Sequence, residues 1–202
     1  MLLHKLRRQE QGFTLIEAVI VIALTGVTVT VFATFFNTSI SRYLSLDKDS
    51  LAFSDLATQA ERIGNVVRGL TDISAADNND ITIYGYFAPD DTYVSLVHYY
   101  LANNNTEVRA DVTPMTSNPP IGTPITNQKK TFTIIDSFYK VSNLNTFEYF
   151  DSLNNTLTPP IADLHTIKNI RINLAIPSKS PVANSDTTIT VTMSLRNRKT
   201  NL

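Results

Sequence analysis

The sequence predicts an α+β protein in which a long N-terminal helix has a transmembrane first half and packs its second half on an antiparallel β-sheet domain. Residues 13–36 form an apolar run that contains a single charge. Residues 37–69 keep apolar side chains at helical spacing, with polar residues between them. Beyond residue 69 the spacing changes to the alternation that is typical of strands.

The composition excludes several functional classes. Of the 202 residues, 43% are hydrophobic and 17% are charged, and the net charge is -1. This balance supports a globular core and gives no general attraction to nucleic acid. The chain contains no Cys, which excludes disulfides, thiolate zinc sites and cysteine catalysis.

The apolar run is long enough to cross a membrane. As a helix, residues 13–36 would cover about 36 Å, and the hydrocarbon core of a bilayer is ~30 Å thick. Residues 1–12 hold three basic residues and one acid, so the positive-inside rule places that end in the cytoplasm and the remainder of the chain outside it. A cleaved secretory signal would have a shorter apolar region followed by a small-residue cleavage site, and residues 37–43 (NTSISRY) do not provide one.

Glu17 is the single charge of the apolar run. A carboxylate inside a bilayer costs about 2.5–3.5 kcal/mol, and such residues are functional by default. Glu17 lies five residues after Gly12, close to the cytoplasmic edge of the expected span. A plain membrane anchor accounts for the length of the segment but not for this carboxylate.

Residues 12–17, GFTLIE, resemble the processing motif of type IV prepilins, in which a basic leader is followed by Gly, Phe, apolar residues, Glu and an unbroken apolar helix. The resemblance implies that the prepilin peptidase removes residues 1–12 as a cytoplasmic leader. The cut would fall between Gly12 and Phe13, and the new amine of Phe13 would be methylated. Because the cut precedes the apolar run, the helix would be retained.

The resemblance also implies a role for Glu17 in assembly. In the family the matching carboxylate pairs with the amino terminus of a neighbouring pilin subunit, and an inner-membrane assembly platform extracts the subunits into a filament. The new amine would have a pKa of about 7.7–8.0 and so would be mostly cationic at neutral pH. Omitting the partner of a buried carboxylate costs about 3–5 kcal/mol, which would favour recruitment of a neighbour.

The helical pattern continues past the expected span to about Arg68, and Gly69 is a suitable C-terminal stop. The amphipathic residues 37–69 are expected to carry one apolar stripe that packs on the β domain. The stripe comprises Ile40, Tyr43, Leu44, Leu51, Leu56, Ala60, Ile63, Val67 and Leu70.

Residues 70–202 are expected to form a β-rich extracytoplasmic domain of short strands. Two Asn-rich turns and a long Pro- and Thr-rich surface loop at 113–130 would separate several of them. The aromatic residues of 84–87 and 99–100 are expected in the core and on the sheet surface, not in a ligand platform. The expected strands cover residues 81–87, 93–101, 107–112, 131–136, 146–150, 167–176 and 187–195.

The order of these strands resembles the minor pilins and the J-type pseudopilins of type II secretion. The matching stretches are VHYYLANNNTEVRAD, NTFEYFDSLNNTL, IKNIRINLAI and the terminal SLRNR. The absence of the Cys pair that closes a loop in many major pilins agrees with a minor subunit. Glu17 argues against the tip pseudopilin, which characteristically lacks that residue.

No pattern for catalysis, a cofactor or a metal is visible. The three His residues are far apart, and the acidic pairs near residues 77–80 and 90–91 read as turns without the spacing of a calcium loop. We therefore expect a structural subunit and not an enzyme, first in the cell membrane by a single pass and then in a pilus or pseudopilus at the cell surface.

Two alternatives remain open. A small basic tail and the loop 113–130 motivate a filament-tip module that binds DNA or a host surface; the tail comprises Arg196, Arg198 and Lys199. A plain membrane-anchored extracytoplasmic domain is the other alternative.

Overall fold

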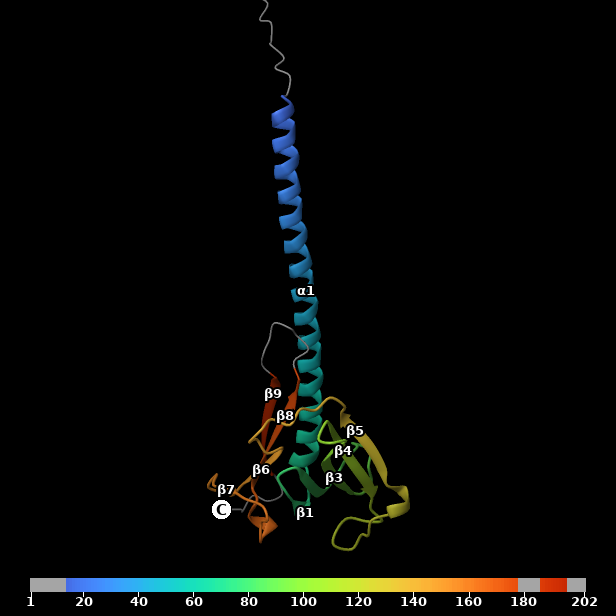
Figure 1. Cartoon of the computed structure of the whole chain (residues 1–202). Coiled ribbons are helices and arrows are strands. Elements are labelled where there is room, and N and C mark those ends of the chain that lie inside the picture. The colour runs from blue at the N-terminus through green and yellow to red at the C-terminus, as the bar shows by residue number, and fades with distance from the viewer. Residues whose placement is uncertain (1–13, 178–185, 196–202) are drawn as a thin grey trace, which may run out of the picture. The chain divides into compact units, whose positions relative to one another are not determined.

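The computed structural model describes residues 14–177 and 186–195 (Figure 1). The expected leader 1–12, Phe13 at the expected cut, and the basic tail at 196–199 lie outside the described residues. The chain divides into two compact units, residues 1–46 and residues 47–202, which are described separately below.

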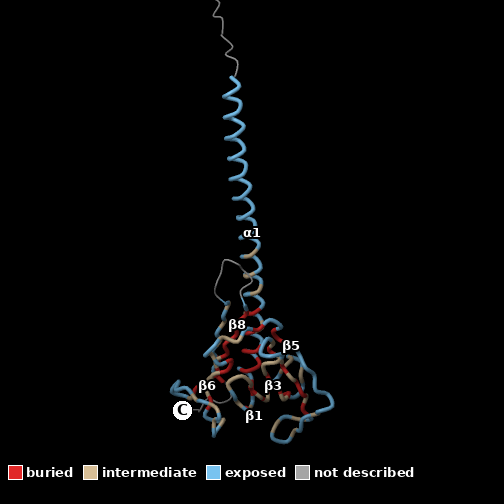
Figure 2. Tube along the Cα trace, viewed as in Figure 1, coloured by how far each residue is buried: buried red, intermediate tan, exposed pale blue. Residues whose placement is uncertain are grey.

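One helix, α1 (Leu15–Arg68), accounts for both predicted helical segments. It begins after Thr14, and it ends at Arg68, where the amide N–H of Gly69 donates to the Asn65 carbonyl oxygen at 3.1 Å. Every residue from 14 to 44 is exposed, as Figure 2 shows by colour. The predicted extent of the helix is therefore confirmed to within two residues at its start and at Arg68 at its end.

Five threonines in the first unit bond to the helix backbone. Each hydroxyl donates to the carbonyl oxygen four residues earlier, at 2.7–2.9 Å. The hydroxyls are thus satisfied within the helix, which makes these residues compatible with an apolar surrounding. They are Thr25, Thr28, Thr30, Thr34 and Thr38.

The first sheet of the second unit is an antiparallel meander of five strands in sequence order. The tight β3–β4 connection is built by three consecutive Asn residues with positive φ, at 103–105, as the Asn-rich turn signal predicts. The strands are β1 (Asp72–Ala76), β2 (Asp80–Gly85), β3 (Ser95–Ala102), β4 (Glu107–Pro114) and β5 (Lys130–Ile135).

The second sheet has the order β7-β6-β8-β9 and is also antiparallel. The described residues therefore form nine strands in two sheets, where the sequence predicts a single sheet domain without β1 and β7. The loop expected at 113–130 also contains a short 3₁₀ helix, η1 (Thr126–Gln128), and a second one, η2 (Leu164–Thr166), precedes β8. The strands are β6 (Phe147–Phe150), β7 (Thr156–Leu157), β8 (Asn169–Ile176) and β9 (Thr187–Ser194).

One hydrophobic core joins the C-terminal part of α1 to both sheets. Tyr149 of β6 lies in this core, and its hydroxyl donates to the Asp77 carbonyl oxygen at 2.7 Å, between β1 and β2. Burial raises the pKa of Tyr149 well above its usual range, so the hydroxyl stays protonated as a donor. The fully buried members include Ile63, Val67, Ile81, Ile83, Val97, Tyr99, Phe147, Ile170 and Ile172.

The predicted apolar stripe of α1 is correct in its last part and wrong in its first. Leu56 and the later members are buried, whereas Leu51 is 65% exposed. Leu51 lies roughly 140° around the helix from Leu56, because each residue advances by about 100°. The other exposed members belong to the first unit, where the described residues contain no strand to cover them: Ile40, Tyr43 and Leu44.

Candidate processing and assembly site

The first turn of α1 is closed by reciprocal hydrogen bonds between Thr14 and Glu17. The backbone N–H and the hydroxyl of Thr14 donate to Glu17 Oε2 at 3.0 and 2.9 Å. The backbone N–H of Glu17 donates in turn to Thr14 Oγ1 at 3.3 Å. This arrangement is a capping box, which satisfies backbone N–H groups that a helix start leaves without partners.

The capping box gives the Glu17 carboxylate a fixed position at the helix start. Its negative charge also lies where the helix dipole favours an anion. Both bonds from Thr14 go to Oε2, and no donor among the described residues reaches Oε1. The carboxylate can therefore remain in the capping box and still accept a hydrogen bond or an ion pair from another group.

Thr14 is the functional residue that the sequence interpretation missed. The signal was present, because a Thr followed three residues later by Glu just before an apolar run is the pattern of a capping box. The Glu17 carboxylate therefore has local hydrogen-bond donors that the sequence interpretation did not identify. Of the predicted processing residues, Gly12 and Phe13 are outside the described residues, so the structure places only Glu17.

The helix that follows this site is long and apolar enough to cross a membrane, judged by length and composition. None of the residues in its most apolar window is buried inside the protein. An apolar surface of this kind is stable when lipid or other protein covers it. The capping box therefore stands at the start of a helix with a continuous lipid-compatible surface.

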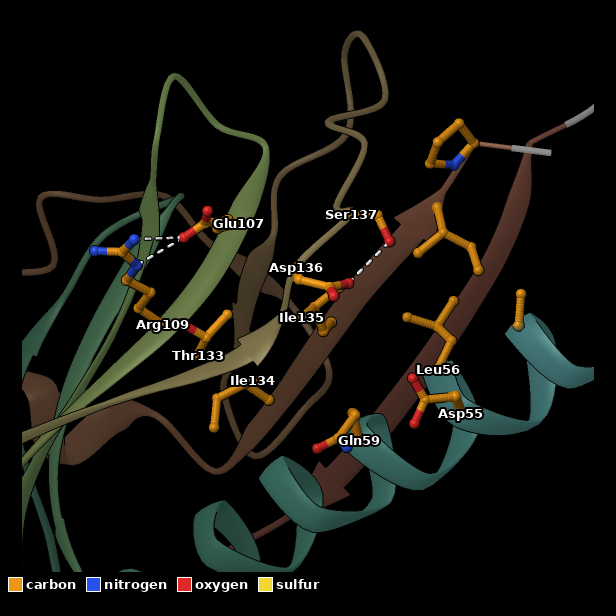
Figure 3. A pocket seen from close by; sticks show the side chains of 13 residues that line it. Asp55, Leu56, Gln59, Glu107, Arg109, Thr133, Ile134, Ile135, Asp136 and Ser137 are labelled. Carbon is orange, nitrogen blue, oxygen red and sulfur yellow. Dashed lines mark hydrogen bonds and ion pairs between the residues drawn. The ribbon is translucent and has the colours of Figure 1, made fainter. Parts of the chain in front are cut away.

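A second candidate site is a cleft of about 650 Å³ in the second unit, lined by α1, β4, β5 and the segment after β5 (Figure 3). Arg109 Nη2 lies 2.6 Å from Glu107 Oε2, and Ser137 Oγ donates to Asp136 Oδ1 at 3.0 Å. Gln59 Oε1 is buried and has no hydrogen-bond partner among the described residues. The lining contains hydroxyls and acids but no His, so no nucleophile is paired with an imidazole base here.

Two small groups of ionisable side chains interact on the surface of the first sheet. His98 Nε2 lies 3.6 Å from Asp80 Oδ1, and its ring stacks on Tyr100 at 4.9 Å between centroids. Asp111 accepts from Thr131 Oγ1 at 2.6 Å and pairs with Lys129 Nζ at 2.6 Å. Within the described ranges, no cluster of three or more His, Cys, Asp or Glu is arranged to hold a metal.

Comparison with known protein families adds one finding. Residues 7–33 match the model of the prokaryotic N-terminal methylation motif, a range that includes Gly12, Phe13, Thr14 and Glu17. No curated protein sequence matches the chain. The match and the apolar helix fit a membrane-anchored structural subunit that is processed at its N-terminus. More particularly, the motif indicates a type IV prepilin-like protein, and the long helix followed by antiparallel sheets is a pilin-like α+β architecture.

Proposed function

We propose that this chain is a minor pilin or pseudopilin, a structural subunit of a type IV pilus or of a type II secretion-like filament. The observation that carries the proposal is the N-terminal methylation motif at residues 7–33, which leads directly into the apolar part of α1. The resemblance of the strand segments to minor pilins and J-type pseudopilins supports a minor subunit.

Processing would begin at the cytoplasmic end of the apolar helix. The prepilin peptidase cuts between Gly12 and Phe13, and the new amine of Phe13 is methylated. The amine is mostly cationic at neutral pH. It therefore needs a nearby anion, because the start of a helix itself carries a partial positive charge.

Glu17 would supply that anion during assembly. The capping box holds the carboxylate by Oε2 and leaves Oε1 without a bond from the described residues. The cationic terminus of a neighbouring subunit can pair with this oxygen while the capping box stays formed. The assembly platform then moves the apolar helix 13–36 from the bilayer into the filament core, and the domain 70–202 forms the outer surface.

Mass spectrometry of the mature protein tests the processing step. In cells with an active prepilin peptidase we expect a chain that begins at N-methylated Phe13. An intact Met1 terminus would identify a plain membrane-anchored domain and would overturn the proposal.

A pair of glycine variants makes this test specific. Gly12→Val should block cleavage, because the peptidase approaches the backbone closely at that position. Gly26→Val is the matched control, since no atom lies within 4 Å of a Cβ added at Gly26. Equal processing of both variants would contradict the assigned cleavage position.

A further inference from the structure

Two adjoining grooves lie on the second unit, and no role has been assigned to either. The helix-side groove, of about 720 Å³, lies where α1 meets the segment after β2 and the β5 strand. The strand-side groove, of about 430 Å³, continues toward β4 and η1. The two grooves share Phe87, Ala88 and Phe132, so they adjoin as two compartments at these residues, which we call the shared floor.

The shared floor is aromatic. The rings of Phe87 and Phe132 lie 5.1 Å apart at an interplanar angle of 30°, and the Arg62 guanidinium lies 5.1 Å from the Phe87 centroid. Phe132 is 36% exposed, and Tyr86 at the edge of the helix-side groove is 43% exposed. Two partly exposed rings in a concave surface favour a ligand with an apolar face.

The turn that follows Phe87 is fixed by its own hydrogen bonds. Asp91 Oδ2 accepts from the Ala88 N–H at 3.0 Å, and the Asp91 N–H donates to the Ala88 carbonyl oxygen at 3.3 Å. Phe87 and Ala88 are therefore held beside β5 before any ligand arrives. A preformed site of this kind binds with a smaller ordering cost.

The polar side chains around the floor are balanced in charge. Each groove is lined by one carboxylate, one cation, one amide and one aliphatic hydroxyl, and the helix-side groove also has the phenol of Tyr86. In the helix-side groove these belong to Glu61, Arg62, Asn65 and Thr58. In the strand-side groove they belong to Asp91, Lys130, Gln128 and Ser95.

This balance defines the ligand class. In either compartment, a charged ligand would be repelled by a side chain that carries the same sign of charge. A wholly apolar ligand would leave the surrounding amides and carboxylates without hydrogen bonds. A neutral ligand with one apolar face and many hydroxyls satisfies both the aromatic floor and the polar rim.

We propose that the two grooves bind a neutral oligosaccharide, with successive sugar rings in the two compartments. The apolar C–H face of a pyranose would stack on Phe132 and Tyr86, and its hydroxyls would bond to the amides and carboxylates of the rim. The site does not depend on the filament role proposed above, since all of its residues belong to the second unit.

The test measures sugar binding by the full chain in micelles of a detergent without a sugar headgroup. Lactose, maltotriose and N,N′,N″-triacetylchitotriose serve as neutral probes, and calorimetry with saturation-transfer NMR serves as the readout. We expect at least one probe to bind, and we expect Phe132→Ala to weaken that binding about tenfold. Absence of binding for all three probes would overturn the proposal.

Two further variants exclude a folding artefact. Asn65→Ala introduces a better helix former at an exposed position of α1, and it should weaken binding without loss of structure. Tyr93→Ala is the matched control, because Tyr93 is 44% exposed and lies outside both groove linings. An equal loss of sugar binding in the Tyr93 variant would contradict the assignment of the binding site to the grooves.

A charged probe separates this ligand class from its competitors. Lactose should bind more tightly than sialyllactose, because Glu61 or Asp91 in the groove lining would repel the carboxylate of the charged sugar. If Phe132→Ala instead impaired only the association with other subunits, while no sugar bound to the unaltered chain, the grooves would be a protein-docking surface and the proposal would be wrong.

Discussion

The two halves of α1 are one continuous helix but are stabilised differently. From residue 14 to residue 44 every side chain is exposed, whereas Leu56, Ala60, Ile63 and Val67 are buried against the sheets. The first half keeps its polar groups satisfied within the helix, by the capping box and by threonine hydroxyls. The second half depends on packing. The helical pattern predicts both halves, and the uniformly apolar run at 13–36 against the amphipathic pattern at 37–69 indicates which surroundings each half requires.

The largest expected effect concerns Glu17 in the first half. Glu17→Ala should leave cleavage at Gly12 largely intact but impair incorporation into filaments, because the cationic terminus of a neighbour loses a partner worth about 3–5 kcal/mol. Immunoblots of sheared filaments against membranes measure this. Glu10→Ala is the control, since Glu10 would be removed with the leader. Normal incorporation of the Glu17 variant would remove the role assigned to this carboxylate.

A core substitution tests the second half. Ile63→Ala should lower the free energy of unfolding by about 2–5 kcal/mol, because Ile63 is 1% exposed and its loss leaves a cavity. Leu51→Ala, at a position that is 65% exposed, should change it by less than about 0.5 kcal/mol. Denaturant unfolding of the full chain in micelles measures both variants. Similar losses would contradict the assignment of Ile63 to the core and of Leu51 to an exposed face of the helix.

The capping box provides a test of intermediate size. Thr14→Ala should destabilise the first turn of α1 by about 0.5–2 kcal/mol, because the reciprocal hydroxyl bonds are lost. Thr14→Ser should keep most of the stability of this turn, because serine also carries a hydroxyl. Thr25→Ala should not alter this turn. Hydrogen exchange of the amides at residues 15–18 measures the change. Equal exchange in the Thr14→Ala and unaltered proteins would show that the box does not hold the helix start.

Alanine substitutions at two glycines compare the space around the two halves of α1. Gly26→Ala should stabilise the helix locally by about 0.5–1 kcal/mol, because an added Cβ meets no atom within 4 Å. Gly64→Ala should show little or no gain, because the new Cβ would lie 3.1 Å from Met193 Sδ on β9. Amide exchange near each position measures the outcome. An equal gain at both positions would contradict the close approach of α1 to β9.

The smallest expected effect is a pH dependence of the stability of the second unit. Partial burial acts to raise the pKa of Asp111, but hydrogen bonds from Lys129 and Thr131 outweigh it and hold the pKa below its usual value. Asp111 therefore stabilises the folded state above its unfolded pKa of about 3.9, and this contribution is lost as the pH falls through the folded pKa. The side chain of Lys129 is 51% exposed, so screening limits the contribution to less than about 1 kcal/mol.

Asp111→Asn should accordingly reduce stability near pH 7 slightly and flatten the loss of stability that occurs below about pH 4. Asp90→Asn, at an exposed turn position, serves as the control. Denaturant midpoints across this range measure the difference. If the denaturant midpoint of the Asp111 variant fell with decreasing pH as steeply as that of the unaltered protein, the Asp111–Lys129 pair would not contribute to stability.

The sequence was most informative where local pattern decides the structure. The apolar run, the amphipathic continuation and Gly69 predict α1 nearly to its ends. β1 was missed because its sequence, DISAA, has only one strongly β-favouring residue, and β7 because it has two residues. The split into two sheets could not be predicted, since alternation identifies a strand but not its partner.

The sites differ in the same way. Glu17 and its partner Thr14 are three residues apart, so their pairing was readable from local spacing. The grooves were not, because Phe87 and Phe132 are distant in the sequence and meet only when β5 completes the first sheet. The sequence places Tyr86 and Phe87 in the core and on the sheet surface. Phe87 does pack against the core, and both residues also line the helix-side groove.

The threonine hydroxyls of the first unit allow the polarity of the helix surface to change with its surroundings. A threonine whose hydroxyl is bonded to its own backbone, as at Thr30 and Thr34, resembles valine in shape and polarity. The same hydroxyl can rotate about a single bond and donate to water or to a neighbouring chain instead. Along residues 25–38, the helix can therefore adjust its polarity by side-chain rotation alone, without any change in its backbone.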